Sequence, residues 1–244
     1  MEAQNLFPGV GDDTLVLAPW FKTEDDGPAG DELYWSEDPE DGWSTGDNSL
    51  DGSDFSSFSV VDRLMVIISK RFPNVSEVVI AGHGMGAAFA QRYAGIGAEL
   101  NLRCDIKVRY VVSNPGSYAL PTSQRSGSTS GCVGTYDKYP YGISDVPAVL
   151  PYASSLSLST SDIQQNLVGR NVFLLLGTGD NATQGNCERA SQSQNRFERG
   201  MNYGDSIKAF NCGAQTTVTT VLGVGHEQNE MFTSMQGVSA LFIG

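Results

Sequence analysis

Histidine is scarce in this sequence, and cysteine never occurs at the spacing of a metal site. The 244 residues include two histidines, His83 and His226, and four cysteines without a C-x-x-C pair, namely Cys104, Cys132, Cys187 and Cys212. Structural zinc sites use several Cys or His ligands at such spacing, so we expect no zinc site. Because the sequence also lacks a phosphate-binding loop and a dinucleotide-binding glycine pattern, we expect no metal and no cofactor.

Long apolar runs are also missing. No run approaches the roughly 18 residues that a membrane-spanning helix needs, so we expect no membrane partner. The first residues, MEAQNLFPG, lack the basic and apolar regions of a signal peptide. We therefore expect a soluble chain that is either cytoplasmic or secreted after processing.

Positive charge is nearly absent from residues 1–54, where Lys22 is the one cation among 15 acidic residues. The net charge of the whole chain is -13, so the excess negative charge lies in this segment. Such a segment repels nucleic acid, which we therefore exclude as a partner. We interpret it as a solvated acidic loop, and a cation site built from Asp25, Asp26 and Asp31 is the alternative.

What the sequence does contain is an alternation of strand and helix patterns, over a length that fits a single domain of residues 1–244. Apolar runs predict strands at residues 14–18, 78–80, 107–113, 172–176 and 216–222. Helical spacing and end signals predict helices at residues 58–72, 87–94, 196–210 and from Asn229 onward. This order predicts an α/β fold, a mostly parallel twisted sheet with helices on both faces.

The most informative stretch is residues 78–94, VVIAGHGMGAAFAQRYA. A β-branched run leads into Gly82-His83-Gly84-Met85-Gly86, and a helix-forming segment follows directly. This is the strand–turn–helix setting of a G-x-S-x-G nucleophile elbow, but position 84 is glycine where a serine is required. Glycine adopts the positive φ of an elbow freely, so we expect the fold to persist without the nucleophile.

Two further residues complete the polar part of such a site. Asp180 follows the predicted strand at 172–176, and His226 follows the predicted strand at 216–222. An acid and then a histidine after the nucleophile is the chain order of this kind of triad. We assign catalysis to Asp180 and His226 and a packing role to His83, while Asp162 and Asp205 are weaker candidates for the acid.

An oxyanion hole at an elbow uses the backbone N–H of the residue after the nucleophile, here Met85. A second N–H comes from the end of the first core strand, for which Trp20 or Phe21 is suitable.

Residues 117–162 are rich in Ser, Gly, Pro and Tyr, and we interpret them as a loop-rich lid. Aromatic side chains here and nearby suggest a small-molecule substrate of apolar or aromatic character, with Trp20, Tyr118 and Tyr141 as binding residues. Ordinary packing is the alternative role for the lid tyrosines. Cys132 and Cys187 are the expected disulfide if the chain meets an oxidising compartment.

With the elbow, Asp180 and His226 in place, the chain resembles the α/β-hydrolase superfamily, in particular its esterase-like bacterial and fungal members. Further stretches that resemble those typical of these members are residues 17–19 (LAP), 32–35 (ELYW), 113–118 (SNPGSY), 139–142 (YPYG), 175–178 (LLGT) and 195–200 (NRFERG). The resemblance implies hydrolysis of carboxylic esters on a Ser-Asp-His plan. It also implies that the chain starts near the third strand of the usual fold.

The departure at Gly84 leaves three hypotheses open. The chain is an engineered inactive variant of a serine esterase, or a natural enzyme in which His226 and Asp180 act as a general base. The base would then act on water or in a cyclisation, lyase or C–C cleavage reaction. Under the third hypothesis the chain is a ligand-binding homologue without catalysis.

Overall fold

The centre of the structure is a parallel sheet of four strands. The computed structural model describes residues 13–98, 102–103, 105–183 and 185–243. The strands are β1 (Glu77–His83), β2 (Lys107–Ser113), β3 (Asn171–Gly177) and β4 (Thr216–Val221), in that spatial order. The register places His83 beside Ser113 and Gly177 beside Val221, so the carboxyl ends of the strands form one edge.

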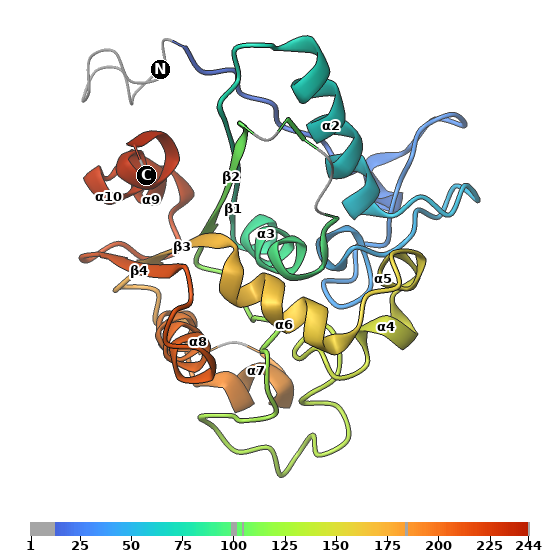
Figure 1. Ribbon diagram of the computed structural model, residues 1–244. Helices are drawn as coiled ribbons and strands as arrows, with labels where there is room; N and C mark the ends of the chain where they lie inside the picture. Colours follow the sequence, from blue (N-terminus) through green and yellow to red (C-terminus); the bar gives the residue numbers. More distant parts are fainter. Residues whose placement is uncertain (1–12, 99–101, 104, 184, 244) are drawn as a thin grey trace.

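Helices cover both faces of this sheet, as predicted (Figure 1). On one face, α3 (Met85–Ile96) packs on β1 and β2, and α8 (Arg196–Phe210) packs on β3 and β4. The helices α2 (Ser57–Arg71) and α6 (Thr160–Gly169) lie against α3. On the other face are α9 (Gln228–Thr233), α10 (Met235–Val238) and the π-helical turn η3 (Ser239–Ile243).

Five short elements lie in the connections: η1 (Glu24–Asp26), η2 (Trp43–Thr45), α4 (Val146–Val149), α5 (Pro151–Ser155) and α7 (Cys187–Gln192). The acidic N-terminal part therefore contains little regular structure. The lid at 117–162 contains α4 and α5, and its predicted boundary overlaps the start of α6.

The strands alternate their side chains between two apolar layers. Ile80, Tyr110 and Leu174 belong to the main core beneath α3 and α8. Leu175 and Val221 point to the other face and pack with Met231 of α9. Because both faces are covered, β1, β2 and β3 are apolar along most of their length, as parallel strands are in such folds. The edge strand β4, with the sequence TTVTTV, is mostly threonine.

The predicted strand at residues 14–18 is wrong. Leu15, Val16 and Leu17 are 55%, 77% and 49% exposed, and no strand pairing includes them. A short apolar run is consistent with a buried strand, but a strand also needs a neighbour to pair with, and sequence periodicity does not supply that information. Within the described residues the sheet ends at β1.

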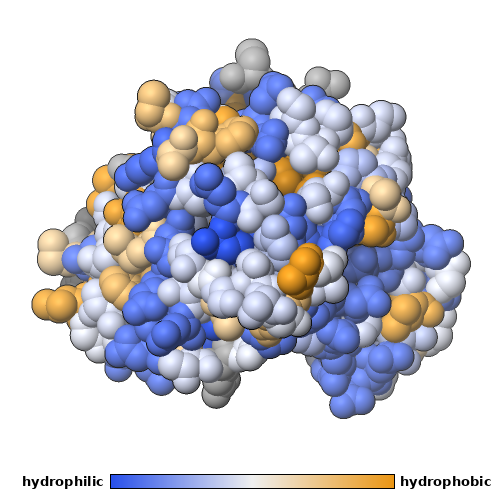
Figure 2. All heavy atoms as spheres, turned by 90° about the horizontal axis from the view of Figure 1, so that it is seen from below, coloured by the Kyte–Doolittle hydropathy of each residue, from blue (hydrophilic) through white to orange (hydrophobic). Residues whose placement is uncertain are grey.

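The surface shows no broad apolar region on the face drawn in Figure 2, where apolar residues occur in small separate groups among polar ones. Within the described residues, no helix is both long and apolar enough to cross a membrane. The alternative cation site at Asp25, Asp26 and Asp31 is not formed, because no group of three or more potential ligands gathers in the described part of the chain.

Candidate active site

The turn between β1 and α3 has the geometry of a nucleophile elbow. A Cβ atom at Gly82 would lie 2.1 Å from the backbone carbon and oxygen of Gly86, so strand and helix approach each other too closely for any other residue. Gly84 has φ 58° and ψ -115°, and its N–H donates to the carbonyl oxygen of Ser113 over 3.0 Å. The turn therefore keeps the positive-φ conformation of an elbow, which would strain any residue other than glycine, although position 84 carries no side chain.

The structure brings Asp180 and His226 together at this turn. The Nδ1 atom of His226 lies 2.8 Å from Oδ2 of Asp180, whose side chain is 1% exposed. A Cβ atom at Gly84 would lie 3.2 Å from Nε2 of His226. Because a carboxylate accepts the hydrogen of Nδ1, Nε2 presents its lone pair to the space where a serine side chain would lie.

Asn114 joins the two loops that carry this dyad, and the sequence analysis missed it. Its side chain accepts a hydrogen bond from Gly177 N–H (2.9 Å) and donates one to the Gly225 carbonyl (3.1 Å). The residue is fully buried and has φ 49°, a conformation that asparagine tolerates better than most residues. The sequence Asn-Pro-Gly at 114–116 is typical of a turn, and it was the one feature of the sequence that could have drawn attention to Asn114.

The loops after β3 and β4 also contact each other through their backbones. Gly179 N–H donates to Val224 O over 2.8 Å, and Thr178 N–H donates to Val221 O over 3.0 Å. A Cβ atom at Gly179 would lie 3.0 Å from the Val224 carbonyl oxygen, so a side chain there would push the Val224 backbone away by a few tenths of an ångström. These bonds fix the distance between Asp180 and His226.

His83 packs against the dyad, in line with its predicted packing role. Its ring centroid lies 4.5 Å from that of His226, and its Nδ1 is 3.1 Å from Oγ of Ser113. Burial, and then the charge that His226 carries when protonated, lower the pKa of His83. A neutral His83 ring thus forms one wall beside His226.

Met85 is the first residue of α3, so its backbone N–H faces the elbow without an intrahelical acceptor. Phe21 packs on Phe89, one turn further along α3, with ring centroids 5.3 Å apart. The segment with Trp20 and Phe21 therefore runs beside the first turns of this helix. Its part in an oxyanion hole stays a prediction.

The three aromatic residues predicted to bind substrate lie in different surroundings. Tyr118 is fully buried and stacks on Tyr203, and Tyr141 is 3% exposed. Burial leaves neither ring a surface for substrate, so the structure favours the packing alternative for both. Trp20 is 70% exposed and lines a groove of about 360 Å³ that does not include Asp180 or His226.

The lid is fastened to the rest of the molecule. Cys132 and Cys187 form the expected disulfide between the lid and α7. Cys212 is a free, exposed thiol, and Cys104 lies outside the described residues. The weaker acid candidates lie elsewhere, since Asp162 caps α6 and Asp205 is exposed on α8.

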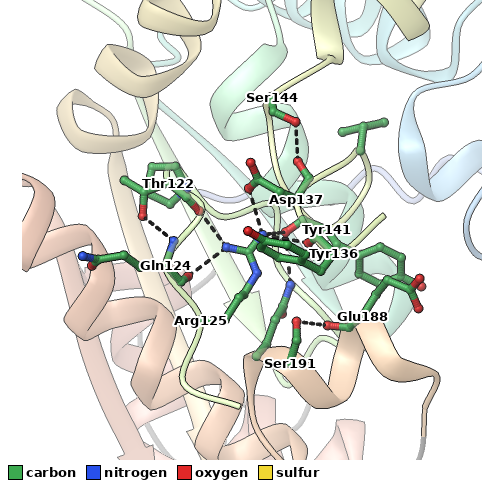
Figure 3. A network of polar contacts seen from close by, with 12 residues as sticks. Thr122, Gln124, Arg125, Tyr136, Asp137, Tyr141, Ser144, Glu188 and Ser191 are labelled. Carbon is green, nitrogen blue, oxygen red and sulfur yellow. Dashed lines mark hydrogen bonds and ion pairs between the residues drawn. The ribbon is translucent and has the colours of Figure 1, made fainter. Parts of the chain in front are cut away.

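Arg125 organises the lid from within (Figure 3). Its side chain is 1% exposed and donates to the carbonyl oxygens of Thr122, Gln124 and Tyr136. It also pairs with Asp137 over 3.1 Å. With the Tyr141 carbonyl, five acceptors on one guanidinium hold the irregular backbone of the lid in a single arrangement.

The fold and the site together define a class. A parallel sheet, an elbow after β1, and an acid–histidine dyad on the next loops along the sheet edge make this an α/β-hydrolase fold.

Comparison with solved structures agrees with this fold. A poly(3-hydroxybutyrate) depolymerase, LpqC, from Bordetella parapertussis superimposes with a TM-score of 0.58 at 18% identity over 81% of this chain. Poly(aspartic acid) hydrolase-1 from Sphingomonas sp. KT-1 gives a TM-score of 0.57 at 19% identity over 75% of this chain. The chain spans 62% of the length of each. No protein-family model and no curated protein sequence matches it.

Proposed function

We propose that this protein hydrolyses carboxylic esters, with His226 and Asp180 activating a water molecule in the space left by Gly84. The observation that carries the proposal is the 3.2 Å between Nε2 of His226 and the Cβ position of residue 84. A water oxygen near that position lies within hydrogen-bond reach of the base. The base is already oriented by Asp180, as catalysis requires.

The reaction needs no covalent enzyme intermediate. Nε2 of His226 takes a proton from water while the water oxygen bonds to the ester carbonyl carbon. The carbonyl electron pair moves to its oxygen, which the N–H of Met85 and the positive end of α3 stabilise. When the intermediate collapses, the C–O bond breaks, and the proton on His226 passes to the departing alkoxide, giving an acid and an alcohol.

The test is a panel of p-nitrophenyl esters offered to the unmodified chain and to three variants. His226→Ala removes the base, and Asp180→Asn removes the charge that orients it. Asp205→Asn makes the same change at an exposed position of α8. We expect kcat to fall by about 10²–10⁴-fold in the first two variants and to stay unchanged in the third.

Two results would contradict this proposal. If the unmodified chain binds an ester without turnover, it is a disabled esterase or a ligand-binding homologue, and the hydrolase proposal fails. If turnover is equal in the unmodified chain and His226→Ala, the dyad is not the catalyst. Both neighbours are named as enzymes that cleave polymers, so polymeric substrates belong in the panel.

A further inference from the structure

The turn between α2 and β1 contains a short motif that the hydrolase function does not use. Asn74, Val75 and Ser76 form an N-x-[ST] sequon with no proline at its middle position, which is the sequence that N-linked glycosylation requires. Asn74 and Ser76 are both exposed. Within the described residues, neither side chain takes part in a hydrogen bond. The amide nitrogen of Asn74 and the hydroxyl of Ser76 are therefore not engaged by the fold.

The backbone of this turn has a defined shape. Val75 N–H donates to Phe72 O over 3.1 Å. This bond closes a reverse turn with Pro73 and Asn74 at its tip, where the fixed φ of proline suits the first of the two positions. Arg103 donates to the carbonyl oxygens of Phe72 (3.3 Å) and Val75 (2.6 Å), so it holds both ends of the turn. Asn74 is thus presented at the tip of an ordered turn.

An aromatic ring lies at the start of the same turn. Phe72 directly follows α2 and is 39% exposed. Because Phe72 is two residues before Asn74 in a closed turn, the first sugar of a glycan on Asn74 lies within reach of this ring. The C–H face of a sugar that covers the ring removes apolar surface from water. The turn therefore offers both an acceptor amide and a surface for the first sugar.

The disulfide between Cys132 and Cys187 points to the compartment in which such glycans are added. Disulfides form and persist in oxidising compartments such as the lumen of the endoplasmic reticulum. Chains that pass through this lumen receive N-linked glycans on surface loops. The disulfide and the exposed sequon are separate features of the molecule, and both fit the same route.

The sequon lies at the end of the sheet away from the dyad. Asn74 precedes β1, whereas the elbow follows His83, the last residue of this strand. A strand rises about 3.3 Å per residue, so the length of β1 separates the two ends by roughly 20 Å. A glycan on Asn74 therefore leaves the carboxyl edge of the sheet open.

A second sequon, residues 181–183, differs in both respects. Asn181 directly follows Asp180, so a glycan there would stand beside the dyad. The residue two positions before it is Gly179, which offers no ring. The comparison favours Asn74 as the acceptor and makes Asn181 a control within the same chain.

We propose that Asn74 accepts an N-linked glycan whose first sugar packs on the ring of Phe72. In this step, Nδ2 of Asn74 bonds to the anomeric carbon of an oligosaccharide carried on a polyprenyl diphosphate. The bond from that carbon to the diphosphate oxygen breaks, the lipid diphosphate leaves with the electron pair, and one amide proton passes to a base of the transferase. The Ser76 hydroxyl is the group that completes the recognised motif.

The first arm of the test measures how much of Asn74 is modified. The full chain is secreted from a yeast host behind a secretion signal, treated with peptide N-glycosidase, and mapped by peptide mass. This enzyme leaves aspartic acid in place of each glycosylated asparagine, so the map locates the glycan. We expect modification at Asn74 in the unmodified chain, in Ser76→Thr and in Asn181→Gln, and its loss in Ser76→Ala.

The second arm tests the contact with Phe72 by thermal melting. The glycosylated chain is compared with Asn74→Gln, and the same pair is prepared with Phe72→Ala and with Phe210→Ala. Phe210 is 42% exposed at the end of α8, so its variant removes a similar ring away from the sequon. The glycan should raise the melting temperature by about 2–4 °C, the shift that one such contact gives in a chain of this length. The shift should disappear in Phe72→Ala and persist in Phe210→Ala.

Three results would overturn this proposal. The first is an unmodified Asn74 in the secreted chain, and the second is modification of Asn181 alone. The third is an equal melting shift with and without the Phe72 ring, which would exclude the contact with the first sugar. None of these measurements uses ester turnover, so their outcome is independent of the hydrolase proposal.

Discussion

At residue 84, an unusual backbone conformation and a missing side chain occur together. A φ of 58° with a ψ of -115° costs about 1–3 kcal/mol for residues other than glycine. An enzyme with serine here bears that cost to place its nucleophile. In this chain that strain is absent, and residue 84 places no side chain against the ring of His226.

Substitutions at this position separate the mechanisms. Gly84→Ala and Gly84→Ser should both lower the free energy of unfolding by about 1–3 kcal/mol, as denaturant melts will show. Gly84→Ala should abolish the activity of the unmodified chain, because its methyl group fills the place of the water 3.2 Å from His226.

Gly84→Ser should instead replace that activity with one that shows a burst of p-nitrophenol and an acylated protein. Its side chain fits if the partly exposed His226 ring shifts by a few tenths of an ångström. Unchanged turnover in Gly84→Ala would show that the space is not used.

Asp47 gives the molecule a pH-dependent contribution to stability. Burial raises the pKa of Asp47 to about 6. The Thr45 hydroxyl has a single hydrogen and contacts both the Asp47 carboxylate and the Gly42 carbonyl, so it offsets the burial of the carboxylate only in part. The folded state thus binds the proton more tightly than the unfolded state does, and this contribution is largest in acid.

The raised pKa of Asp47 determines how the stability of the protein changes with pH. Stability from Asp47 is full below the unfolded pKa of about 3.9 and declines as the pH rises to about 6, and it stays low above that. Asp47→Asn, which mimics the protonated form, should therefore be more stable than the unmodified chain at pH 7 by up to about 2 kcal/mol. The difference between the two proteins should vanish near pH 4, and a constant difference across this range would contradict the account.

Among the structural elements, the carboxyl ends of the four strands determine where the site lies. The elbow after β1, the Asn-Pro-Gly turn after β2, and the loops after β3 and β4 meet at one edge. Asn114 bonds to two of these loops at once, so it couples the position of Asp180 to that of His226.

Asn114→Gly tests this coupling while keeping the positive φ. Loss of two buried hydrogen bonds should reduce stability by about 1–3 kcal/mol and lower ester turnover. The thermal melt measures the first effect, and kcat at a temperature well below the melt measures the second. Asn211→Gly serves as a control, because Asn211 bonds locally in an exposed loop. Full activity in Asn114→Gly would show that the loop backbones alone hold the dyad.

Much of this arrangement could be predicted from the sequence, because strands, helices and the elbow each leave a pattern in neighbouring residues. The ranges 107–113 and 196–210 match β2 and α8, and the elbow, Asp180 and His226 meet as the chain order predicts. What the sequence could not show were side-chain bonds between residues far apart, as in Asn114 with Gly225. Such contacts depend on the folded topology and leave no periodic pattern along the chain.

At the scale of the whole molecule, the lid is a fixed part of the structure. The disulfide between Cys132 and Cys187 closes a loop of 55 residues. Arg125, which precedes this loop, bonds to Tyr136 and Asp137 within it. A cross-link that closes a loop of this size reduces the number of conformations open to the unfolded chain and so stabilises the folded state. In the folded state the same disulfide ties the lid to α7, and Arg125 bonds the lid backbone to itself, so we expect the lid to remain in place during catalysis.

Removing the disulfide between Cys132 and Cys187 should lower the free energy of unfolding. The double variant Cys132→Ser/Cys187→Ser should lose about 2–4 kcal/mol of stability in denaturant melts. Reductant should lower the melting temperature of the unmodified chain but not that of the variant. Cys212→Ser, which changes a free thiol, should have no such effect. Equal melts with and without reductant would contradict a stabilising role for the disulfide.

The central claim is that His226 acts on water and not through an acyl-enzyme. The most direct test follows p-nitrophenyl butyrate turnover by the unmodified chain, with the protein mass measured in acid-quenched samples. The account predicts steady p-nitrophenol release without a burst, an unmodified protein mass throughout, and loss of the release in His226→Ala. A covalent adduct on the unmodified chain, or release that does not depend on His226, would contradict it.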